Sequence, residues 1–297
     1  MKNKCDKFIL RRLLYTPAYK KKLMSSALNS GADGIIVDLE DSVPDIFKEE
    51  ARNNIGYFLD QGLFAGHIIF IRLNPIESKL LFQDLEAVFH SDLTGFMLTK
   101  IYSADDMIYY DKLISQLEIE NGIESDHFSF IPLIETTSAV MDVYKIAKAS
   151  ARTVAIAFGG EDFLDNLTGI HGIPPRAFDY PRAAIALAAR SAHVLPIDTP
   201  YLTLDDEDGF MKEESISFEM GFAGCQLIHP KQIKLANKCF TPSEEEVSRS
   251  YSIVEAIKLS EQKGSGVAML DGMMIGPPMR KRAEKVIKYM ESLEKHK

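Results

Sequence analysis

The sequence predicts a (β/α)8 TIM barrel followed by a C-terminal helical extension. Eight short apolar runs recur along the chain, and nearly every one ends in a charged or polar residue. Segments with helical periodicity separate these runs, as expected for alternating strands and helices. The length of 297 residues suits one barrel with an appendage, because eight strand–helix units need about 250 residues. The expected strands are Leu10–Tyr15, Gly34–Leu39, His67–Leu73, Gly95–Lys100, Phe128–Ile134, Thr153–Phe158, Val194–Ile197 and Gly224–Ile228.

Two of the helices between these runs have clear signals in the sequence. Asp105–Ile119 carries apolar residues at steps of three and four, and the segment Ser103–Asp106 before it is a typical helix cap. Ser138–Ala149 shows the same periodicity. Each segment follows an apolar run, as a strand–helix unit requires.

The C-terminal part of the chain lies beyond the eight strand–helix units. Thr241 is followed by proline and, three residues on, by Glu244, which predicts a helix that is capped by Thr241 and runs towards Glu261. A glycine-rich break, a short hydrophobic piece and a last helix from Met279 follow. We therefore expect a barrel over residues 8–240 and an extension over 241–297, which packs on the barrel or on a neighbouring subunit and is able to cover a barrel mouth.

Composition narrows the class of protein. Hydrophobic residues make up 46% of the chain and charged residues 26%, as in soluble enzymes. No apolar run reaches the ~20 residues of a membrane span, and Met1–Lys7 is polar, so we expect a cytoplasmic protein. The formal net charge of −9 disfavours nucleic acid and anionic lipid as partners. Cys5, Cys225 and Cys239 have no metal-binding spacing, so we expect reduced thiols.

Two carboxylates follow consecutive predicted strands. Glu135 comes directly after one strand, and Asp162 follows the next, behind Gly159 and Gly160. Since the carboxyl ends of barrel strands meet at one mouth, both side chains should lie there, where they would repel each other without a cation or a shared proton. Mg²⁺ takes oxygen ligands, often only one or two protein carboxylates. The alternative is that both residues only cap local structure.

A cation and several acids end two other strands. Arg72 closes the third run, where a guanidinium suits bidentate recognition of a carboxylate or a developing oxyanion. Asp38, Glu40 and Asp41 follow the second run, and strand alternation sends Asp38 and Glu40 to one side and Asp41 to the other. These acids could order metal-bound waters or could pair with Arg72 and Lys100.

Six blocks of the sequence resemble one family, the citrate lyase β-subunit-like branch of the HpcH/HpaI aldolase superfamily. They stand in the family's order and extend the resemblance from Arg11 to about Ile287. The resemblance implies a TIM barrel, commonly trimeric or hexameric, and therefore a homo-oligomer. The blocks are Arg11–Pro17, Gly31–Val43, Ile71–Pro75, Ile134–Thr136, Phe158–Asp162 and Leu227–Ile233.

The resemblance assigns roles around a metal ion. Glu135 and Asp162 match the two Mg²⁺-binding carboxylates of the family. Arg72 matches the arginine that holds the substrate carboxylate or oxyanion beside the metal. Glu40 and Asp41 match the acidic pair that holds the water shell of the metal and Arg72.

The resemblance also implies a coenzyme A site. Arg11 and the basic segment that includes Lys20 and Lys22 lie where the family grips the coenzyme A phosphates, although these lysines equally fit a solvated helix face. His229 and Gln232 match a block that we interpret as mostly structural.

One position departs from the family. Many members place an aspartate from the C-terminal tail of a neighbouring subunit into the site, and this chain has Gly276 there. Glycine cannot carry a proton, so Asp271, a barrel carboxylate or a water has to replace the aspartate, or the reaction differs.

The resulting expectation is a Mg²⁺-dependent carbon–carbon lyase. Its substrate would be a short carboxylated β-hydroxyacyl-CoA thioester such as malyl-, citramalyl- or citryl-CoA, cleaved or formed by retro-aldol chemistry. The alternatives are an aldolase that acts on free α-keto acids without coenzyme A, and a ligand-binding or regulatory protein on a catalytically altered barrel that still binds a metal.

Overall fold

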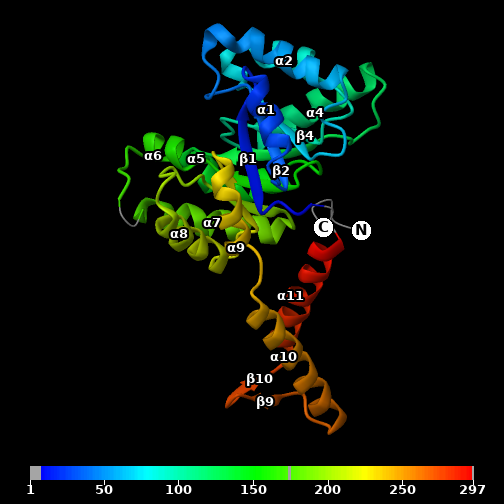
Figure 1. The fold of residues 1–297 in the computed structure, drawn as a ribbon, viewed down its shortest axis with the longest axis vertical. Coiled ribbons are helices and arrows are strands. Elements are labelled where there is room, and N and C mark those ends of the chain that lie inside the picture. The colour runs from blue at the N-terminus through cyan, green and yellow to red at the C-terminus, as the bar shows by residue number, and fades with distance from the viewer. Residues whose placement is uncertain (1–7, 173–174, 296–297) are drawn as a thin grey trace. The chain divides into compact units, whose positions relative to one another are not determined.

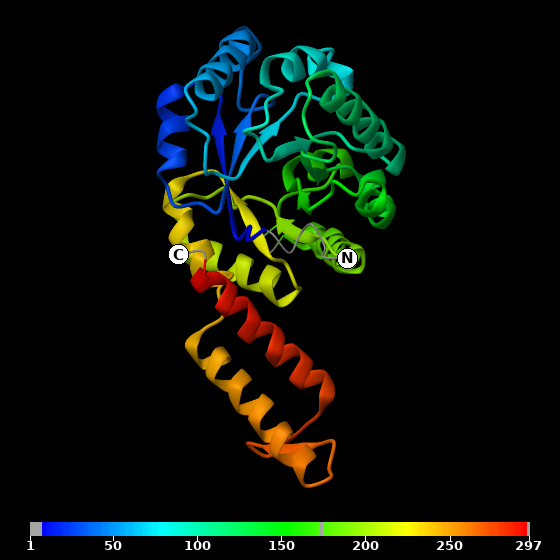
Figure 2. The same cartoon turned by 90° about the vertical axis from the view of Figure 1, so that its right-hand side faces the viewer.

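Eight parallel strands form a closed barrel in the computed structural model, which describes residues 8–172 and 175–295. Each strand pairs with the next in sequence, and β8 pairs with β1, which confirms the predicted fold class (Figures 1 and 2). The strands are β1 (Arg12–Pro17), β2 (Gly34–Asp38), β3 (Ile69–Arg72), β4 (Gly95–Leu98), β5 (Ser129–Ile134), β6 (Ala155–Phe158), β7 (Leu195–Asp198) and β8 (Gly224–Leu227).

Helices surround the strands and bury one face each against them (Figure 2). The capping box predicted before the fourth helix is present, with Ser103 and Asp106 satisfying each other's backbone N–H groups. The helices of the barrel are α1 (Lys21–Leu28), α2 (Lys48–Asp60), α3 (Leu81–Val88), α4 (Ala104–Glu120), α5 (Thr137–Lys148), α6 (Gly160–Leu167), α7 (Asp179–Ala192), α8 (Glu207–Glu219) and α9 (Ile233–Cys239).

Apolar side chains from alternating strand positions fill the inside of the barrel. Leu13, Ile36, Phe70 and Met97, from four successive strands, are all fully buried in one cluster. Such packing makes the barrel a solid core rather than a pore, so ligands are restricted to its mouths. Three strands end in a charged side chain, namely β2 in Asp38, β3 in Arg72 and β7 in Asp198, so charge gathers at the carboxyl rim.

The chain divides into two compact units, with the boundary between Asn237 and Lys238. The second unit contains α10 (Glu244–Gln262), a hairpin of β9 (Ala268–Leu270) and β10 (Met273–Ile275), and α11 (Pro277–Lys295). Its helices pack on each other through a small core of Ile253, Ile257, Ile275 and Ala283. This is the helical extension that the sequence predicts.

The cap of α10 differs from the prediction. Ser243, not Thr241, is the N-cap, and it forms a capping box with Glu246. The Ser243 hydroxyl accepts a hydrogen bond from the Glu246 N–H at 3.1 Å, and the Glu246 carboxylate accepts one from the Ser243 N–H at 2.8 Å. A start at Ser243 also places three glutamates in the first turn, where the helix dipole favours negative charge.

The structure also shows where the cysteines lie and whether any described helix could cross a membrane. Cys225 and Cys239 are both buried thiols, whereas Cys5 and the rest of Met1–Lys7 lie outside the described residues. Within residues 8–172 and 175–295, the helices are all too short or too polar to cross a membrane.

Close contact between β4 and β5 requires a glycine. A Cβ atom at Gly95 would lie 1.8 Å from the carbonyl oxygen of Ser129, its register partner. We expect Gly95→Ala to lower the free energy of unfolding by at least about 3 kcal/mol, because backbone cannot yield as a side chain can. Gly56→Ala in α2 is the control, since its Cβ would contact nothing within 4 Å. Urea unfolding of both variants with equal midpoints would contradict this prediction.

Candidate functional site

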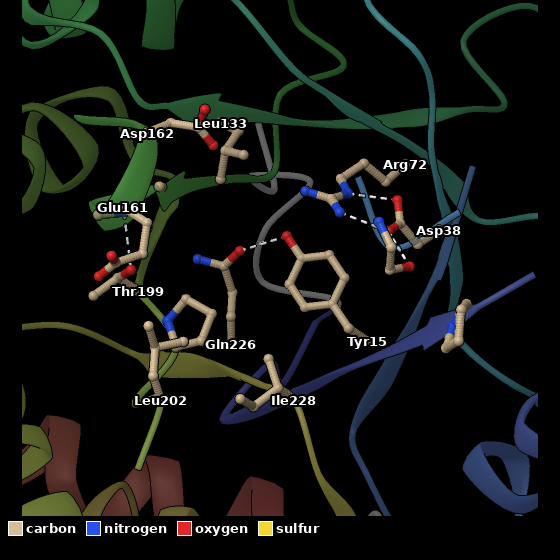
Figure 3. A pocket seen from close by; sticks show the side chains of 15 residues that line it. Tyr15, Asp38, Arg72, Leu133, Glu161, Asp162, Thr199, Leu202, Gln226 and Ile228 are labelled. Carbon is tan, nitrogen blue, oxygen red and sulfur yellow. Dashed lines mark hydrogen bonds and ion pairs between the residues drawn. The ribbon is translucent and has the colours of Figure 1, made fainter. Parts of the chain in front are cut away.

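A cavity of about 260 Å³ opens at the carboxyl ends of the barrel strands. Residues from the ends of β1, β2, β3, β6, β7 and β8 contribute to its wall (Figure 3). This is the end of a (β/α)8 barrel at which catalytic groups are found. The lining residues are Tyr15, Pro17, Asp38, Ser42, Arg72, Leu133, Gly159, Gly160, Glu161, Asp162, Thr199, Pro200, Leu202, Gln226 and Ile228.

Glu135 and Asp162 lie at this mouth with a lysine between them. Lys100 Nζ is 2.5 Å from Asp162 Oδ1 and 3.6 Å from Glu135 Oε1. The backbone N–H of Lys100 also donates to Glu135 Oε1 at 2.6 Å. From the sequence we expected Lys100 at the end of a strand, but we did not predict that it would contact both Glu135 and Asp162.

Neither carboxylate has the capping role that we considered as an alternative. Thr136 caps α5 through its own hydroxyl, which accepts from the Ala139 N–H at 3.1 Å. The N-cap of α6 is Gly159, and Asp162 lies in the first turn of that helix. The N-caps of α5 and α6 are therefore other residues, and the interactions of these two acids described above are with Lys100.

The charges at this point shift one another's pKa. Burial raises the pKa of Glu135 to about 7, although Lys100 acts in the opposite direction. Burial alone would lower the pKa of Lys100, but the nearby Glu135 and Asp162 carboxylates raise it above its usual value. The ammonium group of Lys100 therefore stays charged between the buried Glu135 and the more exposed Asp162.

The donor set fits a hard divalent cation. Glu135 Oε2 is buried without a hydrogen-bond partner, so one carboxylate oxygen is left for a ligand. A Cβ at Gly159 would lie 2.6 Å from Glu135 Cβ and 3.1 Å from Oε2, so glycine is needed beside this carboxylate. Among the described residues no three carboxylate, imidazole or thiol groups are placed to share an ion. An ion at Glu135 and Asp162 would take its other ligands from water or substrate, as Mg²⁺ often does.

Arg72 is clamped at the cavity wall by Asp38 (Figure 3). Its Nε and Nη2 atoms each lie 2.6 Å from an oxygen of the Asp38 carboxylate, a bidentate pair. Burial would raise the pKa of Asp38, but Arg72 lowers it below its usual value. Asp38 also accepts hydrogen bonds from the Glu40 and Ser42 N–H groups, at 2.9 and 3.0 Å. From the sequence we considered Asp38 as a possible partner of Arg72, but we did not include it among the site residues.

The two acids assigned to Arg72 differ in their contribution. Glu40 Oε2 lies 2.9 Å from Arg72 Nη1, and burial raises the pKa of Glu40 to about 8. Asp41 lies 3.7 Å from the same nitrogen, with 63% of its side chain exposed. Asp38 and Glu40 therefore hold the guanidinium, and Asp41 contributes little to its position.

The residues expected to grip coenzyme A are separated by the fold. Arg11 precedes β1, at the amino end of the barrel strands, whereas the cavity lies at the carboxyl end. Its guanidinium pairs with Asp33 at 3.2 Å and donates to Asn237 Oδ1 at 2.8 Å, which explains its burial. Lys20 and Lys22 are exposed at the start of α1, directly after β1, and so lie at the cavity end. Arg11 is therefore not among the residues that we propose for coenzyme A binding.

Two further predicted residues have structural roles. His229 Nδ1 accepts from the Lys231 N–H at 3.1 Å, and Gln232 Oε1 accepts from the N–H groups of Ile228 and His229. Gln232 Nε2 donates to the Tyr201 carbonyl at 2.7 Å. This network fixes the turn after β8, as the structural interpretation expects.

Asp271 and Gly276 belong to the second unit. Asp271 and Gly272 form the turn between β9 and β10, and both have positive φ, of 51° and 76°. Aspartate and glycine favour such hairpin turns, which is a sufficient structural reason for Asp271. Gly276 follows β10, and a Cβ there would meet only Val267 Cγ1, at 3.6 Å.

Carboxylates and a clamped guanidinium at the carboxyl end of a (β/α)8 barrel lie where enzymes of this fold bind and transform small molecules. The chain belongs to the HpcH/HpaI aldolase/citrate lyase family, because the sequence model of that family matches residues 11–230. This result confirms the resemblance inferred from the sequence blocks, and it makes the protein a lyase of that family.

Individual relatives match over nearly the whole chain. The citrate lyase subunit beta of Haemophilus influenzae is 31% identical over 282 residues, which cover 95% of this chain and 97% of that one. The L-malyl-CoA/beta-methylmalyl-CoA lyase of Cereibacter sphaeroides is 28% identical over 300 residues and 94% of each chain. The crystal structure of CitE from Mycobacterium tuberculosis in complex with magnesium, acetoacetate and coenzyme A has a TM-score of 0.77 at 26% identity, covering 94% of this chain and 97% of that one.

The position of Lys100 leads to a test of metal binding. We expect Lys100→Met to tighten Mg²⁺ binding roughly tenfold in titration calorimetry, because a competing cation is lost and charged hydrogen bonds contribute about 1.5–3 kcal/mol. Its melting temperature without metal should fall, since the two carboxylates then repel each other. Lys145→Met, which removes an exposed lysine paired with Asp142, is the matched control. Weaker or unchanged Mg²⁺ binding in Lys100→Met would contradict the prediction.

Proposed function

We propose that the protein is a Mg²⁺-dependent carbon–carbon lyase that cleaves or forms a short carboxylated β-hydroxyacyl-CoA thioester. The observation that carries this proposal is the meeting of Glu135, Asp162 and Arg72 at one barrel mouth, in a chain of the aldolase/citrate lyase family. Relatives named for citrate and malyl-CoA chemistry, and a neighbour crystallised with magnesium and coenzyme A, support it. Malyl-, citramalyl- and citryl-CoA are the substrates to test first.

In this proposal Glu135 and Asp162 hold the ion. Mg²⁺ bound there would lower the pKa of the substrate hydroxyl and offset the charge of the substrate carboxylate. The buried Glu135 provides an oriented oxygen, while the Asp162 side chain, 40% exposed, can turn towards a ligand that enters from the cavity. Lys100 would move aside when the ion binds.

Arg72 supplies a second positive charge for the reaction. Cleavage breaks the bond between the carbinol carbon and the α-carbon of the thioester, the hydroxyl loses its proton, and the α-carbon gains one. Negative charge passes onto the thioester oxygen as that bond breaks, and a guanidinium fixed by Asp38 can stabilise it without reorganising. The rigid Asp38 clamp is the reason that we assign this role to Arg72 rather than to a mobile surface cation.

Lys20 and Lys22 are the residues that we propose for the coenzyme A phosphates. Both side chains are exposed at the cavity end of the barrel. Because the chain has a formal net charge of −9, local positive charge is needed there to attract the phosphates. Lysine binds phosphate as a point charge and does not need a buried cradle. The protein would act as a homo-oligomer, trimeric or hexameric.

Gly276 favours a second candidate, a barrel that binds a metal and a small carboxylate with little or no turnover. A glycine there removes the proton donor that many family members supply from a neighbouring tail. An aldolase that acts on free α-keto acids is the other alternative. Mg²⁺-dependent cleavage of malyl-, citramalyl- or citryl-CoA would support the lyase, whereas binding of the thioesters without cleavage would support the binding protein.

The metal assignment predicts the effect of neutral, isosteric variants. Glu135→Gln and Asp162→Asn should each lower Mg²⁺ affinity at least tenfold, or about 1.4 kcal/mol, and remove Mg²⁺-dependent turnover, because each removes one of two charged ligands. Asp165→Asn is the control, since Asp165 lies on the same helix with an exposed side chain and does not line the cavity. Circular dichroism checks that the barrel is folded. Full Mg²⁺ affinity in both ligand variants would exclude the assignment.

A second prediction concerns the tail. We expect Gly276→Asp to fold, since a Cβ there contacts only Val267, and to raise thioester cleavage if the tail of a neighbouring subunit reaches the metal. Asp271→Asn should lower cleavage only if Asp271 has taken over the proton transfer. Steady-state rates of both variants decide between these possibilities. Unchanged rates in both would show that the tail supplies no proton donor.

A further inference from the structure

The side-chain amide of Gln226 has a fixed orientation inside the barrel. Gln226 is buried on β8, and its Nε2 atom lies 2.8 Å from the Phe158 carbonyl oxygen and 2.9 Å from that of Asp198. Carbonyl oxygens only accept hydrogen bonds, so the NH₂ group has to face them. The amide oxygen, Oε1, therefore points away from these two carbonyl groups.

This orientation determines the direction of the next hydrogen bond. Tyr15 Oη lies 2.8 Å from Gln226 Oε1 (Figure 3). Because an amide oxygen can only accept, the single hydroxyl proton of Tyr15 is donated to it. Met97 Sδ lies 3.1 Å from the same hydroxyl, but a thioether is a weaker acceptor than an amide oxygen.

Tyr15 itself is held in place at the cavity. Its side chain lines the cavity together with Arg72 and Gln226, and the Arg72 guanidinium carbon lies 4.9 Å from the centre of its ring. Burial raises the pKa of Tyr15 far above its usual value, so the phenol stays neutral. With its proton directed at Gln226, the hydroxyl can offer a ligand only its lone pairs.

We propose that Tyr15, oriented by Gln226, is a specificity-determining residue that binds a hydroxyl group of the ligand and disfavours a carbonyl oxygen at the same point. A hydroxyl can donate to the Tyr15 lone pairs, whereas a carbonyl oxygen would face them without a proton between. The inference rests on the proposed function, because in that reaction the hydroxyacyl compound has a hydroxyl where the α-keto acid has a carbonyl.

The test compares two small acids that differ only in this group. Binding of lactate, as each enantiomer, and of pyruvate is measured by titration calorimetry on the full-length protein with Mg²⁺. We expect Tyr15→Phe to weaken binding of the preferred lactate enantiomer roughly three- to tenfold, the effect of one lost hydrogen bond, and to leave pyruvate binding unchanged or tighter. Met97→Leu, which alters the surroundings of the hydroxyl but keeps it, should leave the lactate-to-pyruvate ratio as in the wild type.

A second variant tests the orientation itself. Gln226→Leu removes the stronger acceptor and leaves the Tyr15 proton a choice between the weak acceptor Met97 Sδ and a carbonyl oxygen of the ligand, so the ratio should shift towards pyruvate. Thermal melts identify any variant that fails to fold. An unchanged ratio in folded Tyr15→Phe, with both acids bound, would overturn this inference alone. If neither acid binds to the wild type in a Mg²⁺-dependent way, the inference is overturned, whereas the proposed function is decided separately by Mg²⁺-dependent cleavage of malyl-, citramalyl- or citryl-CoA.

Discussion

The site depends on the balance of buried charge at one end of the barrel. Asp38, Glu40 and Glu135 are almost completely buried there, and a buried carboxylate is stable only with a compensating cation or hydrogen bonds. Arg72 compensates the first two, and Lys100 compensates Glu135. Asp38 and Arg72 also form part of the cavity wall, so this pair fixes part of the surface that a ligand meets.

The barrel architecture makes this concentration of charge possible. Parallel strands bring residues that are far apart in sequence to a common rim, and the apolar interior beneath them excludes water. Hydrogen bonds from backbone N–H groups then hold the acids in place: Asp38 accepts from the residues that follow it, and Glu135 accepts from Lys100. The Arg72 guanidinium is equally fixed, since it lies between a carboxylate clamp and an aromatic ring.

The order and approximate position of the strands could be predicted because apolar runs alternate with helical periodicity. The meeting of Glu135 and Asp162 at one mouth could be predicted because each follows such a run, whereas their role as metal ligands stays a proposal. Which of the three acids at the end of β2 forms the bidentate pair with Arg72 could not be predicted, since it depends on register: Asp38 faces Arg72 because β2 and β3 pair at those residues. The position of Lys100 depends on its left-handed backbone, with φ of 50°, which no sequence pattern indicates. For Arg11 the resemblance pointed to coenzyme A binding, but Arg11 precedes β1 and so lies at the end of the barrel away from the cavity. A match between sequence blocks does not show at which end of a strand a residue lies.

The link between Lys100 and Glu135 has a consequence for how the apoprotein behaves. The backbone N–H of Lys100 holds Glu135 by itself, so the ammonium group can rotate out of the way while the carboxylate stays in position. Loading a divalent ion would then be an exchange of one cation for another within a preformed site, rather than a step that completes folding. Chelators would be expected to strip the ion while leaving an intact barrel behind.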